Sequence, residues 1–365
     1  MPRLKSLLST VGRILLSAVL LGLLLYLFRD KLPEVRALLR DVSSGWLAMA
    51  AGWYVVFIIV SSWRWKVLLA ARGLRFSTWY LSRVFTLSLF FCKLLPTSIG
   101  GDVFRIAYTA PKEKTAEAFS ATLLDRLIGF ESLLFLAVVV SLGLFGLSPD
   151  ARAMELPILG MKFRGLGIVA LLALGLALLV LVTLVFFNDA GHRLAVRVFG
   201  RIRLFRLGER LDRVYDAVKA YRHHRGALFW SFMAGIAVQG MLSLSWFSVA
   251  AALRGTVPLV YYFVFIPLLN IVVNIPTIGG IGVREWAFVL LFAPPWLTGH
   301  LTEGLALASA LLFLALDLVF ALIGGMLFAI MRRSVDASTL VGRQGRDGGS
   351  VEWTRGEEDR HAAES

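Results

Sequence analysis

Long apolar segments with few or no charged residues recur along the chain, and their lengths suit helices that cross a bilayer, which need about 20 apolar residues. Such segments lie at about 12–28, 46–63, 127–148, 165–187, 227–252 and 302–331. The hydrophobic pattern therefore predicts an all-α integral membrane protein with about six full spans.

Two further apolar stretches are interrupted by proline and glycine. One leads into PTSIGGDVFR (96–105), and the other leads into PTIGGIGVRE (276–285). Proline ends a helix, and glycine lets the backbone turn and approach other groups closely. Irregular backbone at membrane depth is tolerated only where it lines a cavity or is buried in protein. We therefore expect two re-entrant or broken helical elements here instead of full spans.

The positions of basic residues predict how the spans are oriented. Segment 189–226 holds ten Lys and Arg against four acids, so we expect it on the cytoplasmic side, as an amphipathic helix on the inner leaflet. If both broken elements turn back, the N- and C-termini are also cytoplasmic. Repeat 1 (about 10–148) and repeat 2 (about 165–331) then start on opposite sides, as in an inverted-topology repeat.

Composition agrees with a membrane protein. Of 365 residues, 58% are hydrophobic and 17% are charged, whereas soluble domains have about 45–50% and 25%. Residues 1–331 are expected to form one transmembrane domain, with the first span retained and not cleaved as a signal. Residues 332–365, rich in Gly, Arg and Glu, are expected to form a disordered cytoplasmic tail.

Charge and cysteine content exclude several function classes. The net charge of +14 is the cytoplasmic excess typical of membrane proteins, and with no DNA- or RNA-binding motif we expect no nucleic-acid partner. Cys92 is the single cysteine, so no intrachain disulfide or thiolate metal cluster is possible. The five histidines lack metal-site spacing, and no nucleophile–base set or P-loop occurs. We expect no catalytic residue, metal or cofactor.

The two interrupted motifs carry the candidate chemistry. A helix that begins after the glycines presents free N–H groups and a positive dipole end, which suits an anion such as phosphate. Arg105 and Arg284 lie one turn into these helices, and a guanidinium matches phosphate geometry. Asp102 can pair with Arg105 at i, i+3, whereas Glu285 adjoins Arg284 and is expected to point elsewhere, towards Arg105 or a proton path. The alternative is tight helix packing with arginines that reach the interface.

Other charges within the expected spans complete the candidate set, because charge inside a membrane is costly. Glu131 is expected to pair with Arg105 or Arg126, and Asp317 lies in the middle of the last span. The candidate substrate-binding residues are Pro96, Gly100, Gly101, Asp102, Arg105, Arg126, Glu131, Pro276, Gly279, Gly280, Arg284, Glu285 and Asp317.

Three segments, LLPTSIGGDVFR (94–105), LLDRLIGFES (123–132) and IPTIGGIGVREWAF (275–288), resemble signature segments of the lysylphosphatidylglycerol synthase transmembrane family. This is the flippase-like membrane domain of the multiple peptide resistance factor, and the resemblance covers about residues 10–331. It implies export or flipping of a lipid, with candidate roles for Asp102, Arg105, Arg126, Arg284 and Glu285. The synthase domain has no counterpart here, so lysyl-transferase activity is not expected. Members often carry arginine where this chain has Asp317, which leaves the head group open.

These observations favour a multi-pass lipid translocase of the bacterial inner membrane. Its partners would be membrane lipids, either an anionic phospholipid or a polyprenyl-phosphate-linked lipid, and a separate lipid-modifying enzyme is a further candidate. The alternatives are an ion-coupled transporter of a small solute, a non-transporting membrane component of cell-envelope lipid or glycan assembly, and an intramembrane lipid-modifying enzyme. The sequence leaves the oligomeric state open.

Overall fold

The computed structural model describes residues 22–24, 26–94, 100–110, 114–147, 155–158, 161–187, 219–272, 280–294, 297 and 300–347. Most of the first expected span, most of the basic segment 189–226 and the end of the tail (348–365) lie outside the described residues. The same holds for three candidate residues, Pro96, Pro276 and Gly279.

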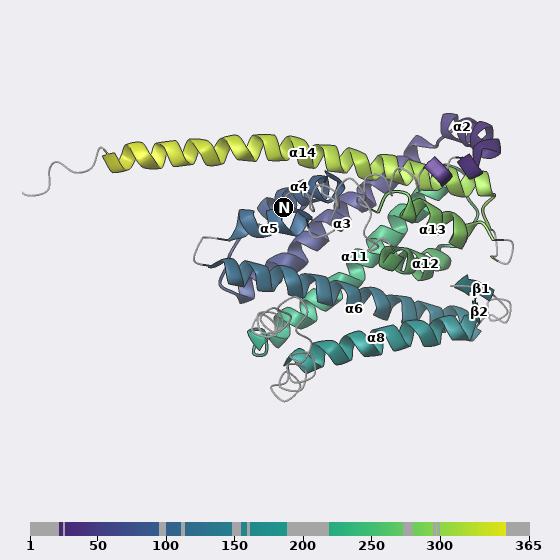
Figure 1. Cartoon of the computed structure of the whole chain (residues 1–365), viewed down its shortest axis with the longest axis horizontal. Helices are drawn as coiled ribbons and strands as arrows, with labels where there is room; N and C mark the ends of the chain where they lie inside the picture. The colour runs from purple at the N-terminus through teal and green to yellow at the C-terminus, as the bar shows by residue number, and fades with distance from the viewer. Residues whose placement is uncertain are drawn as a thin grey trace, which may run out of the picture.

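Helices make up nearly all of the described chain (Figure 1). The long helices are α3 (Ser44–Ala71), α6 (Thr115–Leu147), α8 (Gly165–Phe187), α11 (Arg225–Ala252) and α14 (Glu303–Asp347). The shorter elements are the 3-10 helix η1 (Arg29–Lys31) and helices α2 (Leu32–Arg40), α4 (Thr78–Leu94), α5 (Gly100–Thr109), α12 (Leu259–Val272) and α13 (Val283–Phe292).

Four described segments are long and apolar enough to cross a membrane: Ser44–Ala71, Thr115–Gly146, Arg225–Ala252 and Glu303–Met331. Helix α8 occupies the place of the expected span 165–187 and contains a shorter apolar stretch, Gly167–Leu181. The predicted all-α membrane fold is thus confirmed.

Several helix boundaries differ from those predicted, because hydropathy ends a span at the first charged residue whereas the helices continue past it. Helix α3 continues to Ala71, and α6 begins at Thr115, so Arg64 and Asp125 lie well inside helices. Helix α14 runs to Asp347, into the segment expected to be disordered. No proline interrupts residues 332–347, so nothing in the sequence forces the helix to stop at the membrane surface.

A small β-hairpin connects α6 and α8 and was not predicted. Strands β1 (Glu155–Ile158) and β2 (Met161–Arg164) pair antiparallel, with Glu155 opposite Arg164 and Ile158 opposite Met161. The hydrogen bonds between the two strands satisfy backbone N–H and C=O groups in the connection between α6 and α8.

Two pairs of short helices form antiparallel hairpins, one around each interrupted motif. In the α4–α5 pair, Tyr80 near the start of α4 donates to the backbone oxygen of Tyr108 near the end of α5, at 2.8 Å. In the α12–α13 pair, the rings of Tyr262 and Phe292 lie 4.6 Å apart between centroids. Each pair therefore returns to the end of the bundle from which it starts, as predicted for elements that turn back.

The two helical hairpins return to opposite ends of the bundle (Figure 1). Helices α4 and α5 return to the end where α3 finishes and α6 begins. The other end brings together the start of α3 and the end of α11, since Ser43 N–H donates to the oxygen of Ala252 at 3.0 Å. Helices α12 and α13 return to that end.

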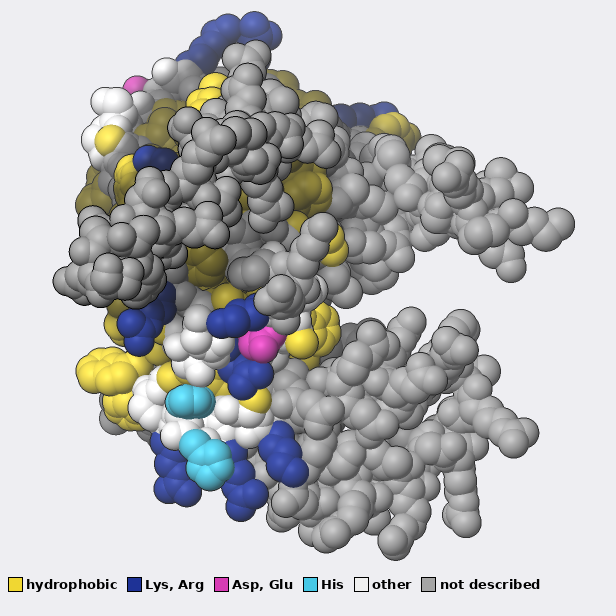
Figure 2. Space-filling view, turned by 90° about the vertical axis from the view of Figure 1, so that its left-hand side faces the viewer, with side chains coloured by type: hydrophobic (Ala, Val, Ile, Leu, Met, Phe, Trp, Pro, Cys, Tyr) yellow, Lys and Arg dark blue, Asp and Glu magenta, His cyan; other side chains and the backbone are white. Residues whose placement is uncertain are grey.

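The first of these ends is rich in basic side chains. Figure 2 shows Lys and Arg gathered on this face, with two His among them. Described exposed basic residues on its connections are Arg75, Lys219, Arg222 and Arg225. Tyr221, on the connection before α11, donates to the backbone oxygen of Leu68 in the last turns of α3 at 2.9 Å, and burial raises the pKa of its hydroxyl.

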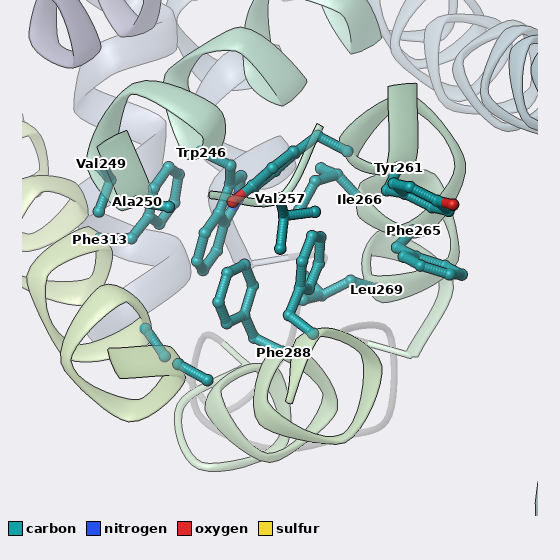
Figure 3. Packing of buried hydrophobic residues seen from close by; sticks show 14 of the residues in the cluster. Trp246, Val249, Ala250, Val257, Tyr261, Phe265, Ile266, Leu269, Phe288 and Phe313 are labelled. Atoms are coloured by element: carbon teal, nitrogen blue, oxygen red, sulfur yellow. The ribbon is translucent and has the colours of Figure 1, made fainter. Parts of the chain in front are cut away.

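The larger hydrophobic core lies where α11, α12, α13 and α14 meet (Figure 3). The ring of Trp246 stacks on Phe288 at 4.5 Å and on Phe313 at 3.8 Å between centroids. A smaller core gathers residues of α3, α4 and α6 around Trp65. The charged residues of the two hairpins lie beside these cores.

Helix α14 packs directly on the backbone of α4 at Gly324, where an added Cβ would overlap the carbonyl group of Thr86. At the neighbouring Gly325 a Cβ would meet only the ring of Phe90, at 3.1 Å, and a side chain can move away. We expect Gly324→Ala to lower the free energy of unfolding by about 1–3 kcal/mol. Gly325→Ala should cost clearly less. Unfolding in mixed micelles titrated with dodecyl sulfate measures both, and equal losses would contradict backbone contact at Gly324.

Candidate functional site

The first motif places α5 against the last turns of α4. An added Cβ on Gly101 would lie 2.5 Å from Cys92 Sγ and 2.6 Å from the backbone oxygen of Ser88, so only glycine fits. This close approach brings two residues of α5 into the interior of the bundle: Asp102, which follows Gly101 directly, and Arg105, which lies one turn further along. Both are buried.

Five charged residues of α3, α5 and α6 meet there, and we call them the first charge cluster: Arg64, Asp102, Arg105, Asp125 and Arg126. Asp125 accepts from Arg64 Nε at 2.7 Å and from Arg105 Nη2 at 2.9 Å. Asp102 accepts from Arg126 Nε and lies 3.5 Å from Arg105 Nη1. The i, i+3 contact between Asp102 and Arg105 is the one expected from their spacing.

Burial differs across the first charge cluster. Arg64, Arg105 and Asp125 are each less than 10% exposed, whereas 30% of the Arg126 side chain is exposed. Three arginines face two aspartates, so the cluster carries one positive charge in excess among the described residues. Arg126 is therefore the member of this cluster that a ligand outside the bundle can contact most easily.

The second motif turns the chain through two glycines with left-handed backbone conformations. Gly280 has φ 76° and Gly282 has φ 86°, values that glycine adopts without a steric penalty. The N–H of Gly282 donates to Glu285 Oε2 at 2.7 Å, which satisfies a free donor at the start of α13. Glu285 also accepts from Arg284 Nε at 3.2 Å. The expectation that Glu285 points away from Arg284 is therefore wrong.

The second charge cluster consists of Tyr54, Lys93, Arg284, Glu285 and Asp317. Asp317 is its centre: Oδ2 lies 2.6 Å from both Arg284 Nη1 and Lys93 Nζ, and Oδ1 accepts from Tyr54 Oη at 2.6 Å. Two cations face two carboxylates, so this cluster is electrically balanced among the described residues. It ties α3, α4, α13 and α14 together.

The two clusters adjoin each other at the end of α4. Lys93 belongs to the second cluster, and the neighbouring Cys92 packs against Gly101, which directly precedes Asp102 of the first cluster. Arg105 and Arg284 nevertheless each pair with acids of their own cluster. The structure thus brings the charged residues of both motifs into one region without joining the two arginines to one partner.

Glu131 lies apart from both clusters. Thr183 of α8 donates to Glu131 Oε1 at 2.5 Å, so the expected pairing of Glu131 with Arg105 or Arg126 is wrong. Both arginines are held by aspartates instead. Glu131 is a polar contact between α6 and α8.

Sequence reasoning missed Tyr54, Arg64 and Trp65. Arg64 directly follows the uncharged segment 46–63, as a residue at a membrane interface would, yet its guanidinium is buried on Asp125. Helix geometry offered a signal, since Arg64 and Lys66 are two residues apart and face different sides of α3. If Lys66 faces the membrane–water interface, Arg64 must therefore face the interior of the helix bundle.

Metal chemistry finds no support in the described part of the chain, where no group of three or more His, Cys, Asp or Glu side chains could hold an ion. The arrangement instead offers buried guanidinium groups that carboxylates hold in place. Such groups can exchange a carboxylate for another oxyanion, such as a phosphate.

Comparison with known proteins gives one finding. The family model described as "Lysylphosphatidylglycerol synthase TM region" matches residues 11–325, which is most of the chain and includes both motifs and both charge clusters. No curated protein and no solved structure matches the chain significantly.

Proposed function

This chain belongs to the family of the lysylphosphatidylglycerol synthase TM region, and we propose that it moves an anionic phospholipid, or a lipid-linked anionic head group, from one leaflet of the inner membrane to the other. The family links the chain to lipid handling in a membrane. The flippase-like activity is our inference from the site.

The observation that carries this proposal is the pair of helical hairpins that return to opposite ends of the bundle. Each contains a glycine pair followed one turn later by a buried arginine, Arg105 in one and Arg284 in the other. We interpret the two halves as the inverted-topology repeat expected from the sequence. In that architecture two related elements open a shared site alternately to either side of the membrane.

The charges support a mechanism of exchange. When the site is empty, aspartates hold the arginines, as Asp102 holds Arg126. A lipid phosphate that reaches Arg126 replaces the carboxylate and keeps the guanidinium paired, so the cation is never left bare in a medium of low dielectric constant. The acyl chains stay in the surrounding lipid.

The orientation follows from the basic end of the bundle. Lys and Arg concentrate on the cytoplasmic side of membrane proteins. We therefore place the end with Arg75, Lys219, Arg222 and Arg225 in the cytoplasm, together with both termini. The α4–α5 hairpin then returns to the cytoplasmic side, and the α12–α13 hairpin returns to the opposite side.

Lipid movement can be measured in liposomes that contain the purified protein and a fluorescent phosphatidylglycerol, with dithionite quenching of the outer leaflet. We expect transfer well above that of empty liposomes. Arg126→Ala should slow it about tenfold or more, because a hydrogen bond between charged partners is lost. The control Arg254→Ala removes an exposed arginine that is paired with Asp41 and should leave the rate unchanged. Wild-type transfer no faster than in empty liposomes would refute the proposal.

A further inference from the structure

We infer that the lipid phosphate binds at the first charge cluster and that two buried donors beside it, Trp65 Nε1–H and Arg105 Nε–H, point to the position of the phosphate. This inference rests on the proposed function and makes its site specific. It assigns a ligand-binding role to Trp65.

Unpartnered donors are the first support. Trp65 is 0% exposed and Arg105 is 5% exposed, yet neither Trp65 Nε1 nor Arg105 Nε has a hydrogen-bond partner among the described residues. Burying a donor without a partner costs free energy, so such groups are rare in native structures. Two of them on residues that touch each other require an explanation.

The geometry of the contact provides the second support. The guanidinium carbon of Arg105 lies 4.2 Å from the centroid of the Trp65 ring, which is a cation–π contact. The guanidinium of Arg105 thus covers the face of the Trp65 ring. The indole N–H lies in the plane of the ring and the Arg105 Nε–H lies in the plane of the guanidinium, so neither donor is used by the stacking contact. A phosphodiester has two non-bridging oxygens that can accept from donors on two separate groups, and it suits this pair.

Charge is the third support. The first charge cluster carries one positive charge in excess among the described residues, whereas the second is balanced. A phosphodiester carries one negative charge, which suits a cluster that has more arginines than aspartates. The phosphate would also give the two buried donors an acceptor.

The binding position is closed in this structure, because both donors are shielded from solvent. Arg126, whose side chain is 30% exposed, is the group of this cluster that a ligand can reach first. A movement of α5 relative to α3 would then open the position between Arg105 and Trp65. Such a step fits a hairpin that admits ligand from one side of the membrane.

Trp65→Phe tests this inference, because it keeps an aromatic ring under Arg105 and removes only the N–H donor and part of the ring. Binding of dioleoyl phosphatidylglycerol to the purified full-length protein would be measured by native mass spectrometry. Diacylglycerol, which has no phosphate, and inorganic phosphate are the comparison probes. We expect the variant to bind phosphatidylglycerol about tenfold more weakly. Its thermal stability should fall about as far as that of Trp246→Phe, since each change removes part of a fully buried ring.

Trp246→Phe is the matched control, because Trp246 is equally buried but stacks in the apolar core on Phe288 and Phe313. It should lose stability and keep its affinity for the lipid. Weaker binding of inorganic phosphate to Trp65→Phe would identify phosphate alone as the ligand, and an effect confined to the lipid would make the whole head group the ligand. If Trp65→Phe binds phosphatidylglycerol and inorganic phosphate as tightly as the wild-type protein does, the inference is overturned. The proposed function is tested separately, by lipid transfer in liposomes with the wild-type protein.

Discussion

Replacing Asp317 with alanine is expected to lower the free energy of unfolding by about 3–5 kcal/mol. Asp317 lies 2.6 Å from both Arg284 and Lys93 and accepts a hydrogen bond from Tyr54. Its removal takes one negative charge away from two cations inside the bundle, and among the described residues Glu285 is the acid that still pairs with Arg284. Because insertion scales put the cost of a charged side chain at the membrane centre at about 2.5–3.5 kcal/mol, we also expect much less protein in the membrane.

Asp41→Ala is a close control for this prediction. Asp41 pairs with Arg254 at 2.6 Å, the same distance as between Asp317 and Arg284, but the side chains of Asp41 and Arg254 are 74% and 80% exposed. Exposed pairs contribute little, so stability should change by less than about 0.5 kcal/mol. Unfolding in mixed micelles measures both variants. If the two aspartates proved equally dispensable, Asp317 would not be the centre of a buried ion cluster.

Asp125→Ala is expected to have a comparably large effect, about 3–5 kcal/mol, in the other cluster. Asp125 accepts from Arg64 and from Arg105, and all three side chains are buried. Without this carboxylate, Asp102 is the single acid left in the cluster for three arginines. The same unfolding titration measures the loss.

Arg64→Met distinguishes charge imbalance from the mere loss of a contact. This variant breaks the same hydrogen bond as Asp125→Ala, but it leaves Asp125 paired with Arg105 and makes the cluster balanced. We therefore expect a clearly smaller loss of stability than in Asp125→Ala. Equal losses would show that the bond between Arg64 and Asp125, and not the excess of cations, determines the cost.

The parts of the fold that depend on local sequence could be predicted. Span positions follow from uncharged runs, and the two hairpins follow from the proline and glycine that interrupt them. The pairing of Asp102 with Arg105 follows from their spacing on one helix face. Contacts between distant helices could not be predicted in this way. Arg64 and Asp125 are 61 residues apart, and hydropathy takes both as charges that end a span.

Glu285 shows a different limit. Its expected direction was derived from a regular helix, in which neighbouring side chains diverge. The structure places Glu285 in the first turn of α13, where its carboxylate folds back to the N–H of Gly282 and so comes within reach of Arg284. The left-handed backbone at Gly282 makes this possible, and that conformation is not apparent from helical periodicity.

The distances along the chain between paired charges also determine the order in which this protein can be assembled during synthesis. Arg284 precedes its partner Asp317 by 33 residues, and Tyr54 precedes it by 263. Since Asp317 lies in α14, the charges of the second cluster balance only after α14 has been synthesised. The earlier helices must until then be kept beside the insertion machinery or near water. The second charge cluster therefore becomes electrically neutral only after α14 has joined the earlier helices.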